Sequence, residues 1–218
     1  MKKFEQELVS LKGRVMHMGH TAEQMVGWAS DAFLKRDRDI VARVHQAEET
    51  VDHLQVEIEG TAVRLITIYT PTARDLRFLL MVVRIITELE RIGDQAVNNC
   101  EYVEMFLTDP PARPLDDLAR MTEIVVEMVH GALEAFEAED VQRAKKVLEL
   151  DDNVDRLNAL TFRDLVAEPS PSGDPELLKR SMSLILLARS LERIADHATN
   201  ICEEVVYLVK GEDIRHQT

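Results

Sequence analysis

The chain has 218 residues, of which 45% are hydrophobic and 5% aromatic, and its formal net charge at pH 7 is −14. That charge argues against binding to nucleic acid, because phosphate backbones are contacted by clustered lysine and arginine side chains. The natural complement of such a chain is a cation or a basic protein surface. Its wealth of aliphatic residues and glutamate, with only 7 prolines and 8 glycines, is typical of packed helices.

Nothing in the sequence directs the chain into or across a membrane. Two lysines follow Met1, but acidic residues come before any apolar run develops, so we expect no signal peptide. The longest apolar stretch, residues 78–86, contains Arg84 and is too short to span a bilayer. Cys100 and Cys202 lack the spacing of a metal site. We therefore expect a cytoplasmic protein.

The N-terminal third of the chain is predicted to form two helices. Apolar residues recur there at steps of three and four, which predicts a first helix with one apolar stripe. The stripe contains Leu8, Leu11, Val15, Met18 and Met25. A second helix is predicted to begin near Asp37 or Asp39, because aspartate is favoured just before a helix, and to run to about Tyr69.

A third helix is predicted after the turn at residues 70–75. Pro71 is tolerated near a helix start, and Thr72 with Asp75 matches a capping box. The helix should run to about Leu107, because the proline-rich residues 108–114 cannot continue it. This linker separates two predicted domains, which are residues 1–109 and 115–212.

The second domain repeats the first. Residues 89–98 and 191–200 are identical at seven of ten positions, at an offset of 102 residues. Residues 48–52 recur in modified form at 151–155, and Asp140 corresponds to Asp37, both at an offset of 103. We therefore predict an all-α protein in which six long helices form two repeated antiparallel three-helix bundles.

Acidic residues occur four positions apart at equivalent places in both repeats. Four residues advance a helix by about 400°, so both members of each pair face the same side. The pairs are Glu48 with Asp52, Glu90 with Asp94, Asp151 with Asp155, and Glu192 with Asp196.

These pairs are also placed symmetrically about the predicted turns. Glu48 and Asp94 are equally far from Pro71, and the second set is centred between residues 173 and 174. Packed helix axes lie about 8–10 Å apart, so four carboxylates in each hairpin can reach a shared centre. Such groups repel one another unless protons or cations neutralise them. We predict one metal site per hairpin, suited to iron, manganese, magnesium or zinc.

Two other interpretations remain open. A metal-free helical adaptor could use the acidic residues as a solvated face, on which Arg91 and Arg193 pair with neighbouring carboxylates, although such pairs contribute little stability. A ferritin-like di-metal carboxylate enzyme would need two Glu-x-x-His motifs on facing helices, and the chain has one, at residues 127–130. No nucleophile with an evident base is present either, so we predict that the protein is not an enzyme.

Four neutral side chains could assist the metal sites. Two asparagines lie one turn beyond the acidic pairs, and we favour local hydrogen bonding for them. Two histidines lie three residues apart on the first helix, and we favour an exposed pair. These residues are Asn98, Asn200, His17 and His20.

Two segments of the first repeat resemble signature segments of the PhoU family. They are residues 71–77, Pro-Thr-Ala-Arg-Asp-Leu-Arg, and residues 89–94, Leu-Glu-Arg-Ile-Gly-Asp. The resemblance covers nearly the whole chain, because that family is similar in having two three-helix repeats with acidic E/D-x-x-x-D motifs. The second repeat departs from the pattern at its inner turn, which lacks Thr-Ala-x-Asp-Leu-Arg.

The resemblance implies a function and a set of partners. It implies that the acidic motif pairs bind multinuclear metal clusters on the surface. It also implies negative regulation of phosphate uptake and of the phosphate-starvation response when phosphate is plentiful. The implied partners are the ATPase subunit of a phosphate ABC transporter and a membrane sensor histidine kinase. We expect a homodimer that meets the membrane only through these partners.

Overall fold

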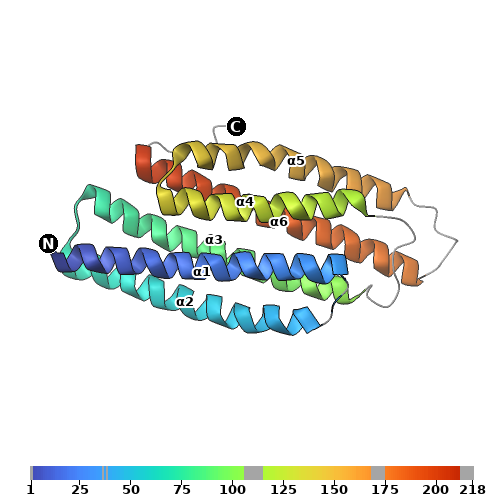
Figure 1. Ribbon diagram of the computed structural model, residues 1–218, viewed down its shortest axis with the longest axis horizontal. Helices are drawn as coiled ribbons and strands as arrows, with labels where there is room; N and C mark the ends of the chain where they lie inside the picture. Colours follow the sequence, from blue (N-terminus) through green and yellow to red (C-terminus); the bar gives the residue numbers. More distant parts are fainter. Residues whose placement is uncertain (1, 36, 38, 106–114, 168–174, 212–218) are drawn as a thin grey trace.

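The computed structural model describes residues 2–35, 37, 39–105, 115–167 and 175–211. All the regular secondary structure in these ranges is helical, and the predicted all-α fold of six long helices is confirmed (Figure 1). The helices are α1 (Lys2–Lys35), α2 (Asp39–Tyr69), α3 (Ala73–Glu104), α4 (Asp116–Ala138), α5 (Val141–Val166) and α6 (Pro175–Lys210).

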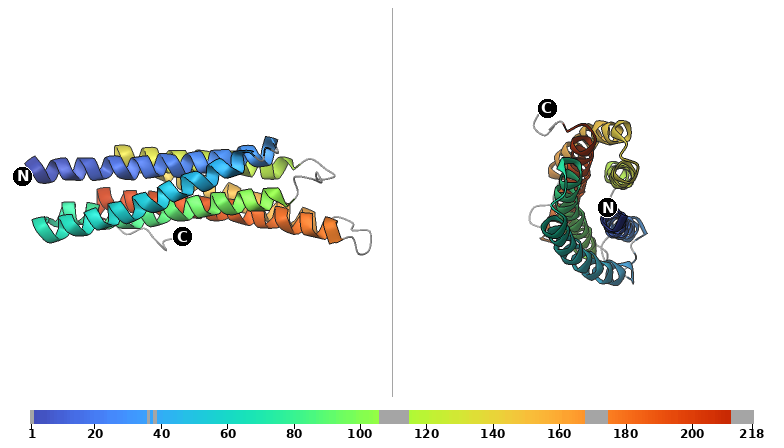
Figure 2. Two further views of the ribbon diagram at one scale, coloured as in Figure 1. Left: turned by 90° about the horizontal axis from the view of Figure 1, so that it is seen from below. Right: turned by 90° about the vertical axis from the view of Figure 1, so that its left-hand side faces the viewer.

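The helices are arranged in two layers that run along the long axis of the molecule. Seen end-on, α5, α6, α3 and α2 form one curved layer, and α1 and α4 lie on its concave side (Figure 2). Within each repeat, the first helix packs against the other two, α1 on α2 and α3, and α4 on α5 and α6. The repeats meet along α3 and α6 and, less extensively, along α1 and α4.

The core consists mainly of aliphatic side chains between these layers. Met18 and Met25 from the α1 stripe are fully buried, whereas Leu8 packs at the edge of the core. Leu89 of α3 and its repeat equivalent Leu191 of α6 are both buried. Burial of each such side chain contributes about 1.5–3 kcal/mol, so the long apolar stripes account for the packing of the bundle.

The helix ends agree with the sequence in part. Asp140 caps α5, because its carboxylate accepts hydrogen bonds from the backbone N–H groups of the residues two and three positions ahead, at 2.8 and 3.2 Å. Tyr69 ends α2 as predicted. The capping box at α3 is wrong, because Thr72 donates its hydroxyl to the side chain of Asp75 at 3.3 Å and caps no backbone group.

The described residues include only part of the predicted boundaries of the repeats. Helix α3 ends at Glu104, three residues before the predicted end. The predicted linker and the predicted inner turn of the second repeat lie almost wholly outside the described residues. Helices α1 to α3 fall within the first predicted domain and α4 to α6 within the second, so the described helices are consistent with that division.

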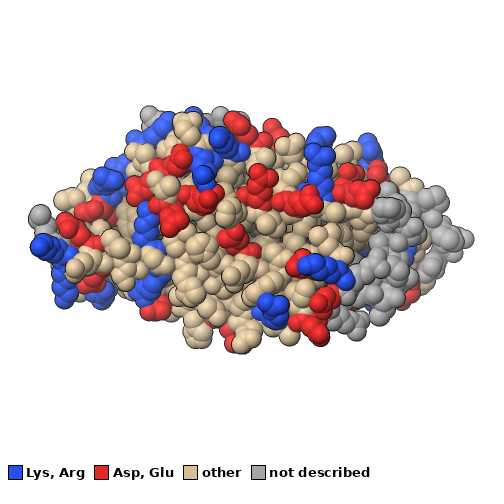
Figure 3. Space-filling model, in the orientation of Figure 1, with Lys and Arg blue, Asp and Glu red and all other residues tan. Residues whose placement is uncertain are grey.

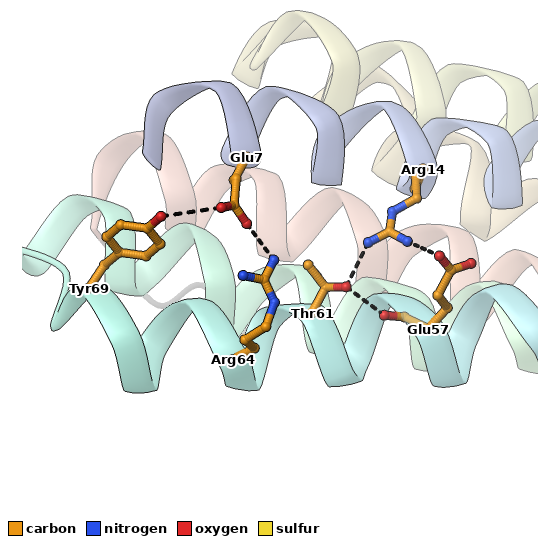
Figure 4. A network of polar contacts seen from close by, with 6 residues as sticks. All are labelled: Glu7, Arg14, Glu57, Thr61, Arg64 and Tyr69. Atoms are coloured by element: carbon orange, nitrogen blue, oxygen red, sulfur yellow. Dashed lines mark hydrogen bonds and ion pairs between the residues drawn. The ribbon is translucent and has the colours of Figure 1, made fainter. Parts of the chain in front are cut away.

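Polar contacts fix the alignment of α1 against α2. Glu7 pairs with Arg64 and accepts a hydrogen bond from the hydroxyl of Tyr69 at 3.2 Å, while Arg14 donates to Oγ1 of Thr61 at 2.6 Å. The hydrogen bond from Arg64 lowers the pKa of Glu7. Ion pairs on the surface add little to the stability of the fold. These contacts join matched positions on α1 and α2, and so they favour one register of the two helices. Figure 4 shows Glu7, Arg14, Glu57, Thr61, Arg64 and Tyr69.

Charges are mixed on the face that carries α1 and α4. Figure 3 shows acidic and basic side chains interspersed there, with a broad uncharged area between them.

The close packing of α1 on α4 leads to a first prediction. A Cβ added at Gly19 would overlap the Cδ2 atom of Leu133, which is buried, whereas a Cβ added at Gly27 would meet nothing within 4 Å. Gly27→Ala is expected to stabilise the protein by about 0.5–1 kcal/mol, because alanine favours the helix. Gly19→Ala should be less stable than Gly27→Ala by about 1–3 kcal/mol. Urea denaturation measures both variants, and equal stabilities would show that the α1–α4 contact is loose.

Candidate metal centre

Four carboxylates on the α2–α3 hairpin are coupled electrostatically. We call them acidic patch 1, which comprises Glu48, Asp52, Glu90 and Asp94. Burial raises the pKa of Glu48, and the charges of Asp52 and Asp94 raise it further. Burial, then Asp94 and Asp52, raise the pKa of Glu90 in the same way. Groups that shift one another's pKa lie within electrostatic reach, so the antiparallel hairpin brings the two pairs level with each other.

The α5–α6 hairpin repeats this arrangement. Acidic patch 2 comprises Asp151, Asp155, Glu192 and Asp196. Burial raises the pKa of Asp151 to about 6, with smaller contributions from Asp155 and Asp196. The pKa of Asp196 is also raised, by burial and by the charges of Glu192 and Asp155. Patch 2 therefore holds the more strongly perturbed carboxylate.

Neither patch is arranged as a finished metal site. Within the described parts of the chain, no three histidine, cysteine, aspartate or glutamate side chains are grouped so that they could hold a metal ion. Several members of the patches are exposed, such as Asp94 and Asp196, and exposed side chains change rotamer readily. The donor set itself fits a hard cation, which prefers carboxylate oxygens. The metal sites remain a prediction.

A polar bridge between the repeats lies beside both patches. Nδ1 of His197 on α6 is 2.7 Å from Oε2 of Glu88 on α3, and Asn200 donates to the same oxygen at 3.0 Å. Burial acts to raise the pKa of Glu88, but these two hydrogen bonds together with the charges of His197 and Arg91 outweigh burial and leave the pKa lowered. His197 also acts to lower the pKa of Glu90 in patch 1 and of Asp196 in patch 2. It therefore lies within electrostatic reach of both patches.

The repeat symmetry places a second, neutral contact at the equivalent position. At the offset of 102 residues, Ser190 corresponds to Glu88 and Gln95 to His197. The hydroxyl of Ser190 donates to Gln95, with its oxygen 3.0 Å from Oε1 and 3.2 Å from the backbone oxygen. The two repeats are thus related by an approximate two-fold axis. The sequence analysis missed this bridge, although the unequal residues at matched repeat positions were a signal for it.

The other candidate residues have structural roles or lie in solvent. Asn200 bonds across to α3, so local hydrogen bonding is wrong for it. His17 and His20 are exposed. Cys100 and Cys202 are fully buried, and burial raises the pKa of each thiol to about 12.

Arginine side chains pair with acidic residues in and beside the patches. Arg91 pairs with Glu88, which lies next to patch 1, at 3.3 Å, as the solvated-face interpretation predicts. In patch 2, Arg189 pairs with Glu192 at 3.6 Å. His130, from the motif at residues 127–130, has its Nδ1 2.7 Å from Oε1 of Glu23. This contact joins α4 to α1 and gives the motif a structural role.

These features define a class of all-helical proteins built from a duplicated three-helix unit with paired carboxylates on its hairpins. A family model described as the PhoU domain matches residues 15–103 and 118–205. The chain belongs to the PhoU family, whose members are accessory and regulatory proteins and not enzymes.

Individual relatives agree in sequence and in structure. Over 217 residues, which are 100% of this chain and 97% of the relative, the chain is 38% identical to a phosphate-specific transport system accessory protein PhoU homolog from Aquifex aeolicus. It is 35% identical to PhoU from Escherichia coli, over 98% of this chain and 88% of that protein. The crystal structure of PhoU from Pseudomonas aeruginosa superposes with a TM-score of 0.90 at 31% identity, over 96% of this chain and 100% of that one.

The described helices also bear on how the chain meets a membrane. None of them combines the length and the apolar character that crossing a bilayer requires.

Proposed function

We propose that the protein is a negative regulator of phosphate uptake and of the phosphate-starvation response. It acts in the cytoplasm as a homodimer, by contact with the ATPase subunit of a phosphate ABC transporter and with a sensor histidine kinase. Membership in the PhoU family carries this proposal, because relatives that match the full length of the chain are named as accessory proteins of the phosphate-specific transport system.

The proposal includes metal ions at the two acidic patches. The metal would neutralise the excess negative charge of each set of four carboxylates, and the candidates are iron, zinc, manganese and magnesium. The raised pKa values of Glu48, Asp94, Asp151 and Asp196 support this, because burial first and neighbouring carboxylates second disfavour the charged forms, and a bound cation would offset both effects. The patches would then serve as structural or regulatory sites, since no catalytic group accompanies them in the described residues.

Deletion of the gene tests the regulatory function. In the natural host grown with ample phosphate, deletion is expected to raise transcription from phosphate-responsive promoters, because the repressing contact is lost. A reporter fused to such a promoter measures the effect, and the wild-type gene on a plasmid should restore repression. Transcription that is unchanged by deletion would contradict the proposed function.

A further inference from the structure

Exposed apolar side chains line the outer side of the α5–α6 hairpin. We call them the apolar stripe. Their exposed fractions range from 42% to 63%, which is high for large hydrophobic residues. The stripe comprises Phe162 and Val166 of α5 and Leu178, Met182 and Leu186 of α6.

The antiparallel register makes these residues one continuous surface. Phe162 with Leu186 and Val166 with Met182 are both centred on residue 174, within about half a residue of the centre of the hairpin, so each pair lies side by side. Along α6 the apolar residues follow one another at steps of four, so they stay on one face of the helix. The stripe thus continues along the hairpin on both helices.

One end of the stripe opens into acidic patch 2. A groove of about 510 Å³ lies between α5 and α6. Phe162 and Ile185 line its apolar end, while Asp155, Glu192 and Arg189 line its charged end, where Arg189 pairs with Glu192 at 3.6 Å. The groove therefore joins an apolar surface to an end at which two carboxylates outnumber one arginine.

The first repeat does not carry the same surface. At the repeat offsets, Glu59 corresponds to Phe162 and Arg84 to Leu186. Both charged residues are exposed, and Arg84 pairs with Glu204 at 3.0 Å. Exposed apolar residues remain there at Val63 and Leu80, but charges interrupt them. The outer faces of the two hairpins are equivalent by duplication, but only the face on α5–α6 is continuously apolar.

We propose that this groove binds an amphipathic helix of a protein partner. In the metal-free protein its leucine-like residues, spaced i, i+4 and i+7, would cover the apolar stripe, and lysine or arginine at one end would lie beside Asp155, because Glu192 already pairs with Arg189. The net negative charge at that end of the groove favours a basic end on the partner. From Leu178 to Glu192 the apolar stripe and the groove together follow α6 for about 20 Å, which sets the minimum length of the bound helix. The inference rests on the proposed function, regulation by protein contact, and specifies the surface and the chemistry of the partner.

A synthetic peptide tests the proposal directly. The probe is a fluorescein-labelled helix of about 18 residues, with leucines at i, i+4, i+7 and i+11 and arginines at one end, and a scrambled peptide of equal composition is the control. Binding to the full chain is measured by fluorescence anisotropy with chelator present. The scrambled peptide should bind at least about tenfold more weakly, and the affinity for the probe should fall as salt is added.

Variants taken from the chain's own first repeat provide the decisive comparison. Phe162→Glu with Leu186→Arg installs the residues of the first repeat and should weaken binding at least about tenfold. Val63→Glu with Leu80→Arg makes the same chemical changes on the first repeat and should alter binding less than about twofold. Circular dichroism and melting temperature confirm folding, which exposed positions should preserve. Equal binding by the two variants, or no binding of the probe to the wild type, would overturn the proposal.

Two further measurements distinguish a partner helix from a second copy of the chain, and a failure of the groove from a failure of the proposed function. If sedimentation shows a wild-type dimer that Phe162→Glu with Leu186→Arg converts to a monomer, a second copy covers the groove and the proposal is wrong. In cells, unchanged transcription after gene deletion contradicts the proposed function itself. If deletion derepresses transcription but the Phe162→Glu and Leu186→Arg variant restores full repression, only the inference fails.

Discussion

Metal at about one hundred times its dissociation constant is expected to stabilise the protein by about 3 kcal/mol per patch, because the folded state alone binds it. Asp94→Asn with Asp196→Asn should lose much of this gain, since each change removes one negative donor from a patch. Without metal, the same double change should leave stability equal or higher, because it relieves repulsion between carboxylates. Thermal unfolding with each candidate metal and with chelator measures both effects.

The control for this experiment changes neighbouring carboxylates. Glu49→Gln with Asp152→Asn removes two exposed charges that lie next to the patches in sequence but are not predicted ligands. This variant should keep nearly the whole metal-dependent gain. If Asp94→Asn with Asp196→Asn keeps it as well, the metal is bound elsewhere and these patches are not the sites.

Asp151→Asn is expected to raise the free energy of unfolding of the metal-free protein at pH 7 by about 2 kcal/mol. The pKa of Asp151 is raised from 3.8 to about 6 in the folded state, so between about pH 4 and pH 6 the folded state binds more protons than the unfolded state. Stability from this group therefore falls as pH rises through that window and stays low above it. Asparagine does not ionise, so the advantage of the variant should disappear as pH falls to about 4.

Urea denaturation at several pH values, with chelator present, measures this difference. Asp152→Asn, at an exposed neighbour, should show a much smaller and flatter effect. A variant at Asp151 that is less stable than the wild type at pH 7 would mean that the carboxylate makes a favourable contact there, contrary to the cost of burial and the smaller repulsion that raise its pKa.

The helices and the facing carboxylates could be predicted because they depend on local spacing. Apolar residues at steps of three and four determine which side of a helix is buried, and a short turn makes neighbouring helices antiparallel. Once the repeat was recognised, equal distances from the turn placed Glu48 opposite Asp94. The same rule holds in the second hairpin, where the described residues include both helices but not the residues between them.

The contact between the repeats could not be predicted from local spacing. The bridge from Glu88 to His197 depends on the crossing angle of α3 and α6, which is set by the shapes of the two complete helix surfaces. Periodicity reports the apolar side of each helix but not its partner. The predicted capping box at α3 is wrong for a local reason, because the hydroxyl of Thr72 donates to the side chain of Asp75 and makes no bond to the backbone of the helix.

The two equivalent contacts along α3 and α6 differ in their residues, which is possible because both repeats are part of one chain. In a dimer of two identical single-repeat chains, every contact across the two-fold axis must occur twice with the same residues. Here one position holds Glu88 with His197 and its equivalent holds Ser190 with Gln95, which such a dimer could never have. The linkage also keeps the halves together at any protein concentration, because their association is intramolecular. The surface residues of each repeat can consequently diverge without weakening the association between the two repeats.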